Sequence, residues 1–541
     1  MTDKTVANDV VEALRDLGVR HVFGVPSGGW VDYMEALRTT DGIEFVLATH
    51  EGGAAFMADV CGRLSGAPGV CFGTFGPGAT NLATGVGSAL LDRSPMIAFT
   101  DEMPAPMRGR VTQMGIDHQA LFAPLTKATT RLEAPRARDM VLAAGQQAMA
   151  ERPGPVHVGL PVGMSAEPSS GASSSVVGNP QQPAVAPALL EQCAQQLAAA
   201  EKPLLVLGLA AVRFGVANAA IAIAEQLQAP VVLTPMAKGL INESHPLYAG
   251  VLFHALSDVV AETYAQADLV LAVGYDPVEF NYEQWMPQVP LLNLDTMPVD
   301  IDGAAYGDTV DAVGDIAVSL EYLKGQNFAA AQWDIAALGR RRESMFARMR
   351  PNPDTLGPCS ALDSLRDSLP QDGIMVCDVG AHIHLIGQKW PTPAVGTQIM
   401  TNGWSAMGFA IPGAVAAKLC RPDVPVCAVV GDGGFLMTAG ELAVAVRRNL
   451  HIVFVVFTDN DLALIRIKQE KKDNPIYGTP IRDVGTIGGD NLFGVPVLKA
   501  LNLDEYREAL DAAWQQEGPV IVEAIFDSRE YDDLVLRKNK L

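Results

Sequence analysis

Residues 424–434 read Val424-Pro-Val-Cys-Ala-Val-Val-Gly-Asp-Gly-Gly434, an apolar segment that ends in a glycine turn around Asp432. A second apolar segment, 452–457, leads after one residue to Asp459. A strand, a glycine turn, a helix and a second strand account for this spacing. Such a βαβ unit places both strand ends at one edge of a parallel sheet, with a helix N-terminus between them, where phosphates and their metal ions bind. We therefore expect Asp432 and Asp459 to lie together at that edge.

The two aspartates suit a hard metal ion. The carboxylates of Asp432 and Asp459, one backbone carbonyl and two phosphate oxygens would give the octahedral oxygen coordination that Mg²⁺ prefers. A Gly-Asp-Gly string alone is a weak signal, because most Asp-Gly pairs are ordinary turns. Here the second acidic segment and the strand expected before each aspartate favour a metal site over a simple turn.

This pattern resembles the diphosphate-and-magnesium motif of thiamine-diphosphate enzymes, in which Gly-Asp-Gly is followed by a short Asn/Asp segment. That segment reads Thr458-Asp459-Asn460-Asp461 here and departs from the commoner Asn-Asn form. The resemblance implies that Asp432 and Asp459 are side-chain ligands of Mg²⁺ and that the carbonyl of Asp461 is a third ligand. It also implies thiamine diphosphate as the cofactor, bound in part by the turn of Gly431, Gly433 and Gly434.

The composition is that of a large globular enzyme. Of the 541 residues, 49% are hydrophobic and 18% are charged, and a chain of this length exceeds what one core supports. The net charge of −22 argues against nucleic-acid binding, so we expect no nucleic-acid partner. The seven cysteines form no CxxC pair, which favours buried thiols in a reducing compartment over disulfides.

The N-terminus and the apolar stretches give no sign of export or membrane insertion. The sequence MTDKTVANDV lacks the apolar core of a signal peptide. The longest uncharged stretch, 68–91, contains many glycines together with Pro77 and Asn81, so a buried loop and helix are favoured over a membrane span. We expect a cytoplasmic protein with no membrane partner.

Three blocks of alternating helical and strand patterns follow one another. The first covers residues 1–165 and the second 186–325, with a Ser- and Pro-rich linker between them. The second block looks Rossmann-like, yet its first strand is followed by Gly208-Leu-Ala-Ala rather than a GxGxxG fingerprint, so dinucleotide binding has weak support. A helical connector expected over 327–350 leads to the third block, 355–541.

This order is similar to the pyrimidine-binding, central and diphosphate-binding domains of the pyruvate-oxidase-like thiamine-diphosphate family. The resemblance covers essentially the whole chain and implies an α/β fold of three doubly wound parallel-sheet domains. In that family, the first domain of one subunit and the third domain of another hold the cofactor together. The resemblance therefore implies a homodimer or a dimer of dimers, a homotetramer, with active sites at the subunit interface.

Glu51 is the expected activator of the cofactor. It lies in His50-Glu51-Gly52-Gly53-Ala54, which follows a predicted strand and opens an alanine-rich helix. From position alone, a carboxylate in a first helical turn is explained by its interaction with the helix dipole. The resemblance instead implies that Glu51 hydrogen-bonds N1′ of the aminopyrimidine and favours the imino form that removes the thiazolium C2 proton. A buried apolar setting would raise the pKa of this carboxyl and suit it to that task.

Further segments resemble cofactor contacts of the family. Met407 stands where the family has an apolar wedge beneath the cofactor, and the carbonyl of Ser405 would accept a hydrogen bond from the N4′ group. A core methionine on a helix is the alternative. The turn 73–78 resembles the segment that packs over the pyrimidine, although by itself it is an ordinary strand-to-helix turn. The remaining implied cofactor contacts are Thr74, Gly76 and Asn81 and, facing the diphosphate after another strand, Gly380, Ala381 and His382.

Three more residues are candidates for the active centre. Ser27 lies in a loop that resembles the family's Pro-Gly-rich loop, where its hydroxyl would touch a substrate carboxylate. Gln113 lies in a segment that resembles the one carrying a glutamine near the active centre. His118 follows in the same segment, but the twin histidines of pyruvate-decarboxylase-type members are absent. A surface or capping histidine is the commoner role for such a residue, and an active-site acid is the alternative.

Residues 273–280, Val-Gly-Tyr-Asp-Pro-Val-Glu-Phe, resemble the run of the catabolic, FAD-free acetolactate synthases and not that of the FAD-holding relatives. We therefore expect no FAD. Asp461 replaces the glycine expected in those synthases, and the segment after it also differs. Leu464, Ile465 and Lys468 would share the helical face that in relatives covers the substrate. A cation at position 468 would suit a second anionic group on the substrate, and a solvated lysine is the alternative.

The resemblance implies decarboxylation of a 2-oxo acid and carboligation of the resulting enamine to a second carbonyl, as in acetolactate synthase. The alternative within the fold is a decarboxylase that releases an aldehyde. Its substrate would be dianionic if Lys468 contacts a second anionic group. A non-catalytic binding protein would keep the fold, but the intact Glu51, Asp432 and Asp459 disfavour it. The expected partner is thus a small-molecule 2-oxo acid, which the sequence does not name.

Overall fold

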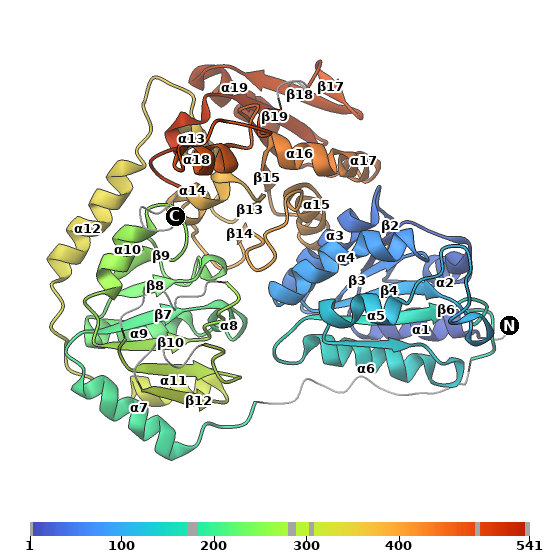
Figure 1. Ribbon diagram of the computed structural model, residues 1–541, viewed down its shortest axis with the longest axis horizontal. Coiled ribbons are helices and arrows are strands. Elements are labelled where there is room, and N and C mark those ends of the chain that lie inside the picture. The colour runs from blue at the N-terminus through green and yellow to red at the C-terminus, as the bar shows by residue number, and fades with distance from the viewer. Residues whose placement is uncertain (1–3, 170–181, 280–287, 302–307, 482–486, 536–541) are drawn as a thin grey trace.

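The computed structural model describes residues 4–169, 182–279, 288–301, 308–481 and 487–535. This part of the chain forms three sheets flanked by helices, which we call the first, central and third domains in chain order (Figure 1). All strand pairs are parallel except one, so the predicted α/β class with three parallel-sheet domains is confirmed. Among these residues no helix is long and apolar enough to span a bilayer. The 170–181 part of the predicted linker lies outside the described residues.

The first domain has the strand order β2-β1-β3-β4-β6-β5. Strands β3, β4 and β6 are buried along their whole length, as expected for a parallel sheet that helices cover on both faces. The strands are β1 (His21–Gly24), β2 (Glu44–Leu47), β3 (Gly69–Gly73), β4 (Met96–Glu102), β5 (Ala128–Arg131) and β6 (Pro155–Pro161), and the helices are α1 (Val6–Asp16), α2 (Val31–Thr39), α3 (Glu51–Ser65), α4 (Pro77–Leu91), α5 (His118–Phe122) and α6 (Ala137–Met149).

The central domain has the order β12-β11-β10-β7-β8-β9, again all parallel. Its short first crossover, β7 to α8, begins at Gly208, where a Cβ would lie 2.4 Å from the Gly274 carbonyl oxygen, so this turn serves close packing of two strand ends. The strands are β7 (Pro203–Leu207), β8 (Val231–Leu233), β9 (Tyr248–Val251), β10 (Leu269–Val273), β11 (Leu291–Asp295) and β12 (Thr309–Val313), and the helices are α7 (Pro187–Ala199), α8 (Leu209–Arg213), α9 (Ala217–Leu227), α10 (Ser257–Tyr264) and α11 (Ile316–Lys324).

The helical connector is shorter than predicted. A helix was expected over 327–350, whereas α12 spans Ile335–Arg348. The Asp334 side chain caps its start by accepting a hydrogen bond from Ala337 N at 2.9 Å, and Asn327 has a left-handed backbone with φ of 53°. The prediction is therefore wrong for residues 327–334, because the cap fixes the helix start well inside the predicted segment.

The third domain contains the predicted βαβ unit. Strands β15 and β16 are parallel neighbours, with Gly431 opposite Phe457, so both strands end at the same edge. The sheet order is β14-β13-β15-β16-β19-β18-β17, with an antiparallel pair at the β17 edge. The strands are β13 (Ile374–Cys377), β14 (Gln398–Ile399), β15 (Val426–Gly431), β16 (Val453–Thr458), β17 (Asn491–Leu492), β18 (Val495–Ala500) and β19 (Val520–Ile525), and the helices are α13 (Pro358–Ser368), α14 (Ala381–Lys389), α15 (Ala410–Cys420), α16 (Asp432–Thr438), α17 (Leu442–Arg447), α18 (Ala463–Glu470) and α19 (Leu503–Trp514).

A half-buried arginine joins the first domain to the third. Arg63, on α3, pairs with Asp59 at 2.7 Å and with Asp92 at 3.0 Å, and its Nη1 donates to the Met400 carbonyl at 2.6 Å. Asp92 Oδ1 in turn accepts hydrogen bonds from the main-chain N–H groups of residues 402 and 403, at 3.1 and 2.7 Å. The loop that carries the predicted residues Ser405 and Met407 is therefore anchored on the first domain.

Glu441 makes a second contact between these domains. This third-domain carboxylate, 1% exposed, accepts hydrogen bonds from His50 N at 2.9 Å and from Thr49 N at 3.1 Å, directly before α3. Burial is the main cause that raises its pKa to about 7, against an ordinary value of 4.5. A Cβ on Gly53 would lie 2.3 Å from Glu441 Oε1, so this contact requires a glycine at position 53.

We expect Glu441→Ala to lower the thermal unfolding midpoint, because two main-chain N–H groups lose their acceptor, at about 1 to 2 kcal/mol in total. The raised pKa sets the pH dependence: the folded state holds the proton more tightly than the unfolded chain, so the contribution of Glu441 is greatest at low pH and is lost as pH rises through about 7. The wild-type advantage should therefore shrink between about pH 5.5 and pH 8. Melting curves across that range measure it, with the exposed Glu508→Ala as control, and an advantage that grows with pH would refute the assignment.

Candidate functional site

The two predicted metal-ligand carboxylates lie at the adjacent ends of β15 and β16. Asp432 begins α16, where its Oδ2 accepts a hydrogen bond from Asn460 N at 2.7 Å and its Oδ1 accepts one from Gly433 N at 2.8 Å. Asp459 Oδ1 accepts a hydrogen bond from Asp461 N at 3.1 Å. The turn after β16 is thus bonded directly to the aspartate after β15.

Burial and mutual repulsion act on both carboxylates. Burial raises the pKa of Asp432 to about 6. Burial, followed by the charge of Asp432, raises the pKa of Asp459 to about 7. Like charges close together in a low-dielectric site disfavour ionisation, and a bound cation would relieve that cost. The donors are oxygens, which suit Mg²⁺ better than a thiophilic metal.

The glycines of this turn occupy positions where a side chain does not fit. A Cβ on Gly434 would lie 2.1 Å from Asp378 Oδ2, and a Cβ on Gly433 would lie 2.9 Å from Leu462 Cδ2. The same point on Gly433 is 3.3 Å from Met407 Cε, so the predicted wedge residue lies over the glycine turn. Met407 is half-buried in a turn ahead of α15, so it is not the core helix methionine of the alternative interpretation.

Asp378, to which the sequence reasoning gave no role, holds the site together. Its buried carboxylate accepts hydrogen bonds from the main-chain N–H groups of Val379 at 2.8 Å, Gly408 at 2.9 Å and Phe409 at 3.1 Å. Burial raises its pKa to about 7. The signal that finds it is the one used for Asp432, an acidic residue directly after an apolar strand.

The predicted diphosphate segment opens α14, with Gly380 as its cap and Ala381 as its first residue. His382 is buried, and its Nε2 has no hydrogen-bond partner among the described residues. A Cβ on Gly431 would lie 3.2 Å from His382 Cε1, so the imidazole packs against the glycine turn. Burial lowers the pKa of His382 to about 4, which leaves a neutral ring at neutral pH. An unpaired buried nitrogen beside this turn marks a place for a polar ligand group.

The unexpected Asp461 is explained by an ion pair. Its Oδ2 lies 3.3 Å from Nε of Arg466, a buried residue that also pairs with Glu470 at 2.6 Å and with Asp532 at 2.7 Å. The Asp461 side chain is thus held by an ion pair with α18. The Asp461 carbonyl oxygen accepts no hydrogen bond from any residue that the structure describes, which leaves it available as the predicted third ligand.

The predicted substrate-facing residues lie on the outer face of α18. Ile465 is 44% exposed, Lys468 is exposed and Leu464 is half-buried. Arg466 and Ile467, on the opposite face, are buried. The expected grouping of Leu464, Ile465 and Lys468 on one face is therefore confirmed, whereas contact with a substrate stays a prediction.

Glu51 begins α3, as the sequence predicts, and is 8% exposed. His50 caps the helix through Nδ1, which accepts a hydrogen bond from Gly52 N at 3.0 Å. Asn81 Nδ2 donates to Glu51 Oε2 at 2.9 Å, and a Cβ on Gly78 would lie 3.3 Å from Glu51 Oε1. The carboxylate is thus held between α3 and the glycine-rich start of α4, beside a predicted cofactor residue.

Asp101, a second residue that the sequence reasoning missed, connects two predicted loops. Its Oδ2 accepts hydrogen bonds from Ser27 Oγ at 2.5 Å and from Thr74 Oγ1 at 3.1 Å. It lies near the end of the apolar strand β4, and burial raises its pKa. Because the Ser27 hydroxyl donates its proton to Asp101, only acceptor capacity remains, which disfavours the predicted contact of Ser27 with a substrate carboxylate.

His118 is neither a surface nor a capping residue, which corrects the commoner role expected for it. Its side chain is buried, its Nε2 accepts a hydrogen bond from Gly76 N at 3.2 Å, and its Nδ1 lies 2.9 Å from Thr100 Oγ1, while Asp117 caps the helix. Burial lowers the pKa of His118 to about 4, so at neutral pH the ring has no extra proton to give. The geometry therefore supports positioning of the Gly76 turn and disfavours the active-site-acid alternative.

The loop that carries Gln113 lies beside the same turn. Gln113 is exposed. The main chain of its neighbour Met114 packs closely on Gly76, because a Cβ on Gly76 would lie 2.9 Å from the Met114 carbonyl oxygen. Gly76 has a positive φ of 48°, which a glycine adopts without strain. The predicted first-domain residues thus form one group around the Gly76 turn and Glu51.

The predicted residues form two groups rather than one. The first-domain group contains Glu51 and Asn81, and the third-domain group contains Asp432 and Asp459. In the part of the chain that the structure describes, no hydrogen bond or ion pair joins the two groups. A site that uses both groups therefore needs a ligand or a second subunit to connect them.

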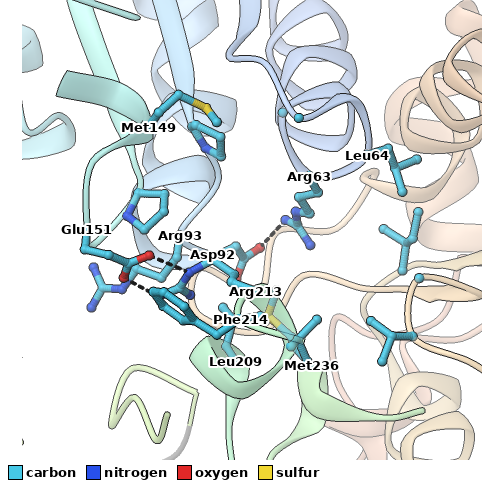
Figure 2. A pocket seen from close by; sticks show the side chains of 18 of the residues that line it. Arg63, Leu64, Asp92, Arg93, Met149, Glu151, Leu209, Arg213, Phe214 and Met236 are labelled. Atoms are coloured by element: carbon cyan, nitrogen blue, oxygen red, sulfur yellow. Dashed lines mark hydrogen bonds and ion pairs between the residues drawn. The ribbon is translucent and has the colours of Figure 1, made fainter. Parts of the chain in front are cut away.

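A cavity of about 720 Å³ lies elsewhere, where the three domains meet (Figure 2). None of the predicted site residues lines it. The charged groups drawn there are paired: Arg63 with Asp92 at 3.0 Å, and Arg213 with Glu151 at 2.6 Å. The cavity is therefore separate from the site of Asp432 and Glu51.

Three family models match the chain in the order of its domains. The N-terminal TPP binding domain of thiamine pyrophosphate enzymes matches residues 4–121, the central domain matches 190–323, and the C-terminal TPP binding domain matches 378–524. The chain is a thiamine-diphosphate enzyme. Lyase or transferase chemistry with this cofactor is the activity of its class.

Relatives of this thiamine-diphosphate enzyme include acetolactate synthases. The acetolactate synthase of Bacillus subtilis is 29% identical over 98% of this chain and 94% of its own length. The large subunit of acetolactate synthase isozyme 2 of Escherichia coli is 30% identical, with 96% and 95% covered. A probable 2-ketoarginine decarboxylase of Pseudomonas aeruginosa is 31% identical, with 96% and 93% covered. The enzyme is thus close to acetolactate synthases, while its relatives include both ligating and decarboxylating activities.

We expect Asp432→Ala to lose thiamine diphosphate during gel filtration in Mg²⁺ buffer, because one of two anionic groups that would hold the metal is removed. The exposed Asp372→Ala serves as a matched control and should keep the cofactor. Cofactor content per chain is measured by mass spectrometry after denaturation, and dialysis against EDTA should strip the wild type as well. Full retention by the variant would show that Asp432 is not a ligand.

Proposed function

We propose that this enzyme decarboxylates a 2-oxo acid with thiamine diphosphate and Mg²⁺ and joins the remaining fragment to a second carbonyl compound, as the name acetolactate synthase describes for its relatives. The observation that carries the proposal is that one chain holds both a buried, amide-bound Glu51 and a half-buried pair of carboxylates, Asp432 and Asp459. The first suits control of a proton and the second suits a metal-bound diphosphate.

The third-domain residues would hold the metal and the diphosphate. The carboxylates of Asp432 and Asp459 and the carbonyl of Asp461 would bind Mg²⁺. Gly433 and Gly434 let the turn pack closely on Leu462 and Asp378, and His382 Nε2 offers an unpaired polar atom. When bound, thiamine diphosphate supplies the carbanion-stabilising chemistry that a 2-oxo acid needs in order to lose carbon dioxide.

Glu51 would act by holding a proton. Its carboxyl would share a proton with the aminopyrimidine ring, while Asn81 Nδ2, bonded to Oε2, keeps the carboxyl in one orientation. Met407, half-buried beside Gly433, would fix the angle at which the cofactor rings meet. The Ser405 carbonyl oxygen would accept a hydrogen bond from the amino group of the aminopyrimidine. Asp101 would orient Thr74 and the Gly76 turn would shape the pocket wall.

The substrate class is suggested by α18. The exposed Lys468 would attract a second anionic group on the 2-oxo acid or on the acceptor. The same charge would repel a guanidinium-bearing acid of the kind that the name 2-ketoarginine decarboxylase implies for one relative. The positive charge of Lys468 therefore favours an anionic or neutral substrate over a cationic one. Between ligation and simple decarboxylation, it favours ligation as in the acetolactate synthases. A decarboxylase that releases an aldehyde is the second candidate, which the relationship to that decarboxylase supports.

The assembly would be a homodimer or a dimer of dimers in the cytoplasm, without FAD. Glu51 and Asp432 belong to groups that no hydrogen bond or ion pair joins within the described residues of one chain, which fits a site shared between subunits. The side chains at the ends of the central strands β7 and β10 are used for packing and for the pair Arg93–Asp276 at 2.6 Å, which argues against a bound dinucleotide.

The first test is turnover. Flavin-free holoenzyme, checked by its absorbance, is incubated with pyruvate and with neutral, cationic and dianionic 2-oxo acids, and products are identified by mass. If Lys468 contacts the substrate, Lys468→Met should lower kcat/KM for a dianionic acid about ten- to a hundredfold while sparing pyruvate, because a charge-assisted contact contributes about 1.5 to 3 kcal/mol. The exposed Lys472→Met is the control. Equal losses on both substrates would reject the assignment, and aldehyde as the sole product would favour the second candidate.

The second test is complementation between subunits. Glu51→Gln chains and Asp432→Ala chains should each be inactive as pure oligomers. After mixing and exchange, part of the activity should return, because one of the two sites in a mixed dimer is built from intact halves. Activity is measured against subunit ratio. An active monomer, or no recovery despite exchange shown by native mass spectrometry, would contradict a shared site.

A further inference from the structure

Three side chains of metal-ligating types lie close together where the first and third domains meet. His21 begins β1, Cys61 lies in α3, and Cys420 is the last residue of α15. The two sulfur atoms are 2.9 Å apart, and one ligand atom from each of the three residues lies within 4.8 Å of the others. Their thiol and imidazole groups differ from the carboxylates around Asp432, and nothing proposed above uses them.

We propose that His21, Cys61 and Cys420 form a binding site for one zinc-like ion. A tetrahedral ion with bonds of about 2.3 Å to sulfur and about 2.0 Å to nitrogen places its ligand atoms about 3.5 to 3.8 Å apart. The two sulfur atoms, at 2.9 Å, are closer than this, and the imidazole nitrogen lies within 4.8 Å of both. Small rotations of the three side chains would therefore bring them into coordination without movement of the helices.

The surroundings of His21 suit a metal ligand. Its Nε2 lies 3.5 Å from Glu44 Oε1, and Glu44 is held by Arg448 at 2.8 Å. A carboxylate beside a ligating imidazole commonly fixes its tautomer and its orientation. Two thiolates would balance the charge of a divalent ion, and Arg448 balances Glu44, so the occupied site adds no net charge to this interface.

The fourth coordination position would be open. Cys61 is 5% exposed, but His21 and Cys420 are half-buried and all three residues line a cavity of about 450 Å³. A three-ligand site with room for water or an exogenous ligand is the arrangement of zinc ions that remain reactive. The thiol and imidazole donors would select a zinc-like ion, whereas the oxygen donors of Asp432 and Asp459 would select Mg²⁺.

The ion would connect the first and third domains of one chain. Cys61 is near the C-terminal end of α3, whose first residue is Glu51, and Cys420 ends α15, which packs along α3 in Figure 1. A bond between these helix ends would restrain the helix that carries Glu51 from its opposite end. The site would thus stabilise the interface between the first and third domains.

The test is Co²⁺ and Zn²⁺ binding to reduced holoenzyme with excess Mg²⁺ and thiamine diphosphate, so that the acidic site is blocked. One Co²⁺ per chain should bind with a thiolate charge-transfer band in the near ultraviolet, and Zn²⁺ should displace it and raise the melting temperature. Cys61→Ser, Cys420→Ser and His21→Gln should each weaken binding by about a hundredfold or more. Cys193→Ala, a buried thiol on α7, is the control and should bind as the wild type does.

Either of two results would overturn the proposal. One is binding of Co²⁺ by the Cys61→Ser/Cys420→Ser double variant that equals wild-type binding. The other is a peptide map in which Cys61 and Cys420 have formed a disulfide that resists the reductant, which would make the pair a covalent link instead of a metal site. Should the serine variants fold poorly, His21→Gln alone decides, because it keeps both thiols.

Discussion

Two half-buried carboxylates at neighbouring strand ends are the constraint around which the third domain is built. The parallel register that sets Gly431 opposite Phe457 forces Asp432 and Asp459 to the same edge, where each raises the cost of ionising the other. The surrounding main chain is arranged to support this charge. Asn460 and Asp461 donate their N–H groups to it, and the glycines of the turn allow close packing against Asp378 and Leu462.

Much of this could be predicted from the sequence, because both signals are local. Strands covered on both faces are apolar along their whole length, so β15 and β16 are visible as runs, and an acidic residue after each run is unusual enough to indicate a site. Glu51 also has a local signal, as a charge at the start of an alanine-rich helix, but position alone indicates only an interaction with the helix dipole, and its role follows from the family resemblance. Such patterns predict where the acidic side chains lie along the chain and which turns hold them.

The partners of these residues could not be predicted. Asp378 binds the main chain at residues 408 and 409, and Glu441 binds it at residues 49 and 50, so each contact joins segments that no local pattern relates. The burial that removes the extra proton from His118 depends likewise on Thr100 and on the Gly76 turn. Local chemistry predicts which side chains matter, whereas tertiary packing decides what each of them is free to do.

The anchoring of residues 402 and 403 on Asp92 has a consequence for how the enzyme is made. During synthesis the first domain leaves the ribosome long before that loop, and it can fold with Arg63 and Asp92 already in place. The loop then closes onto a preformed template rather than searching with a flexible partner, which reduces the entropy lost in a contact of such long range. A nascent chain shortened before residue 400 would leave the Asp92 carboxylate without these two main-chain donors.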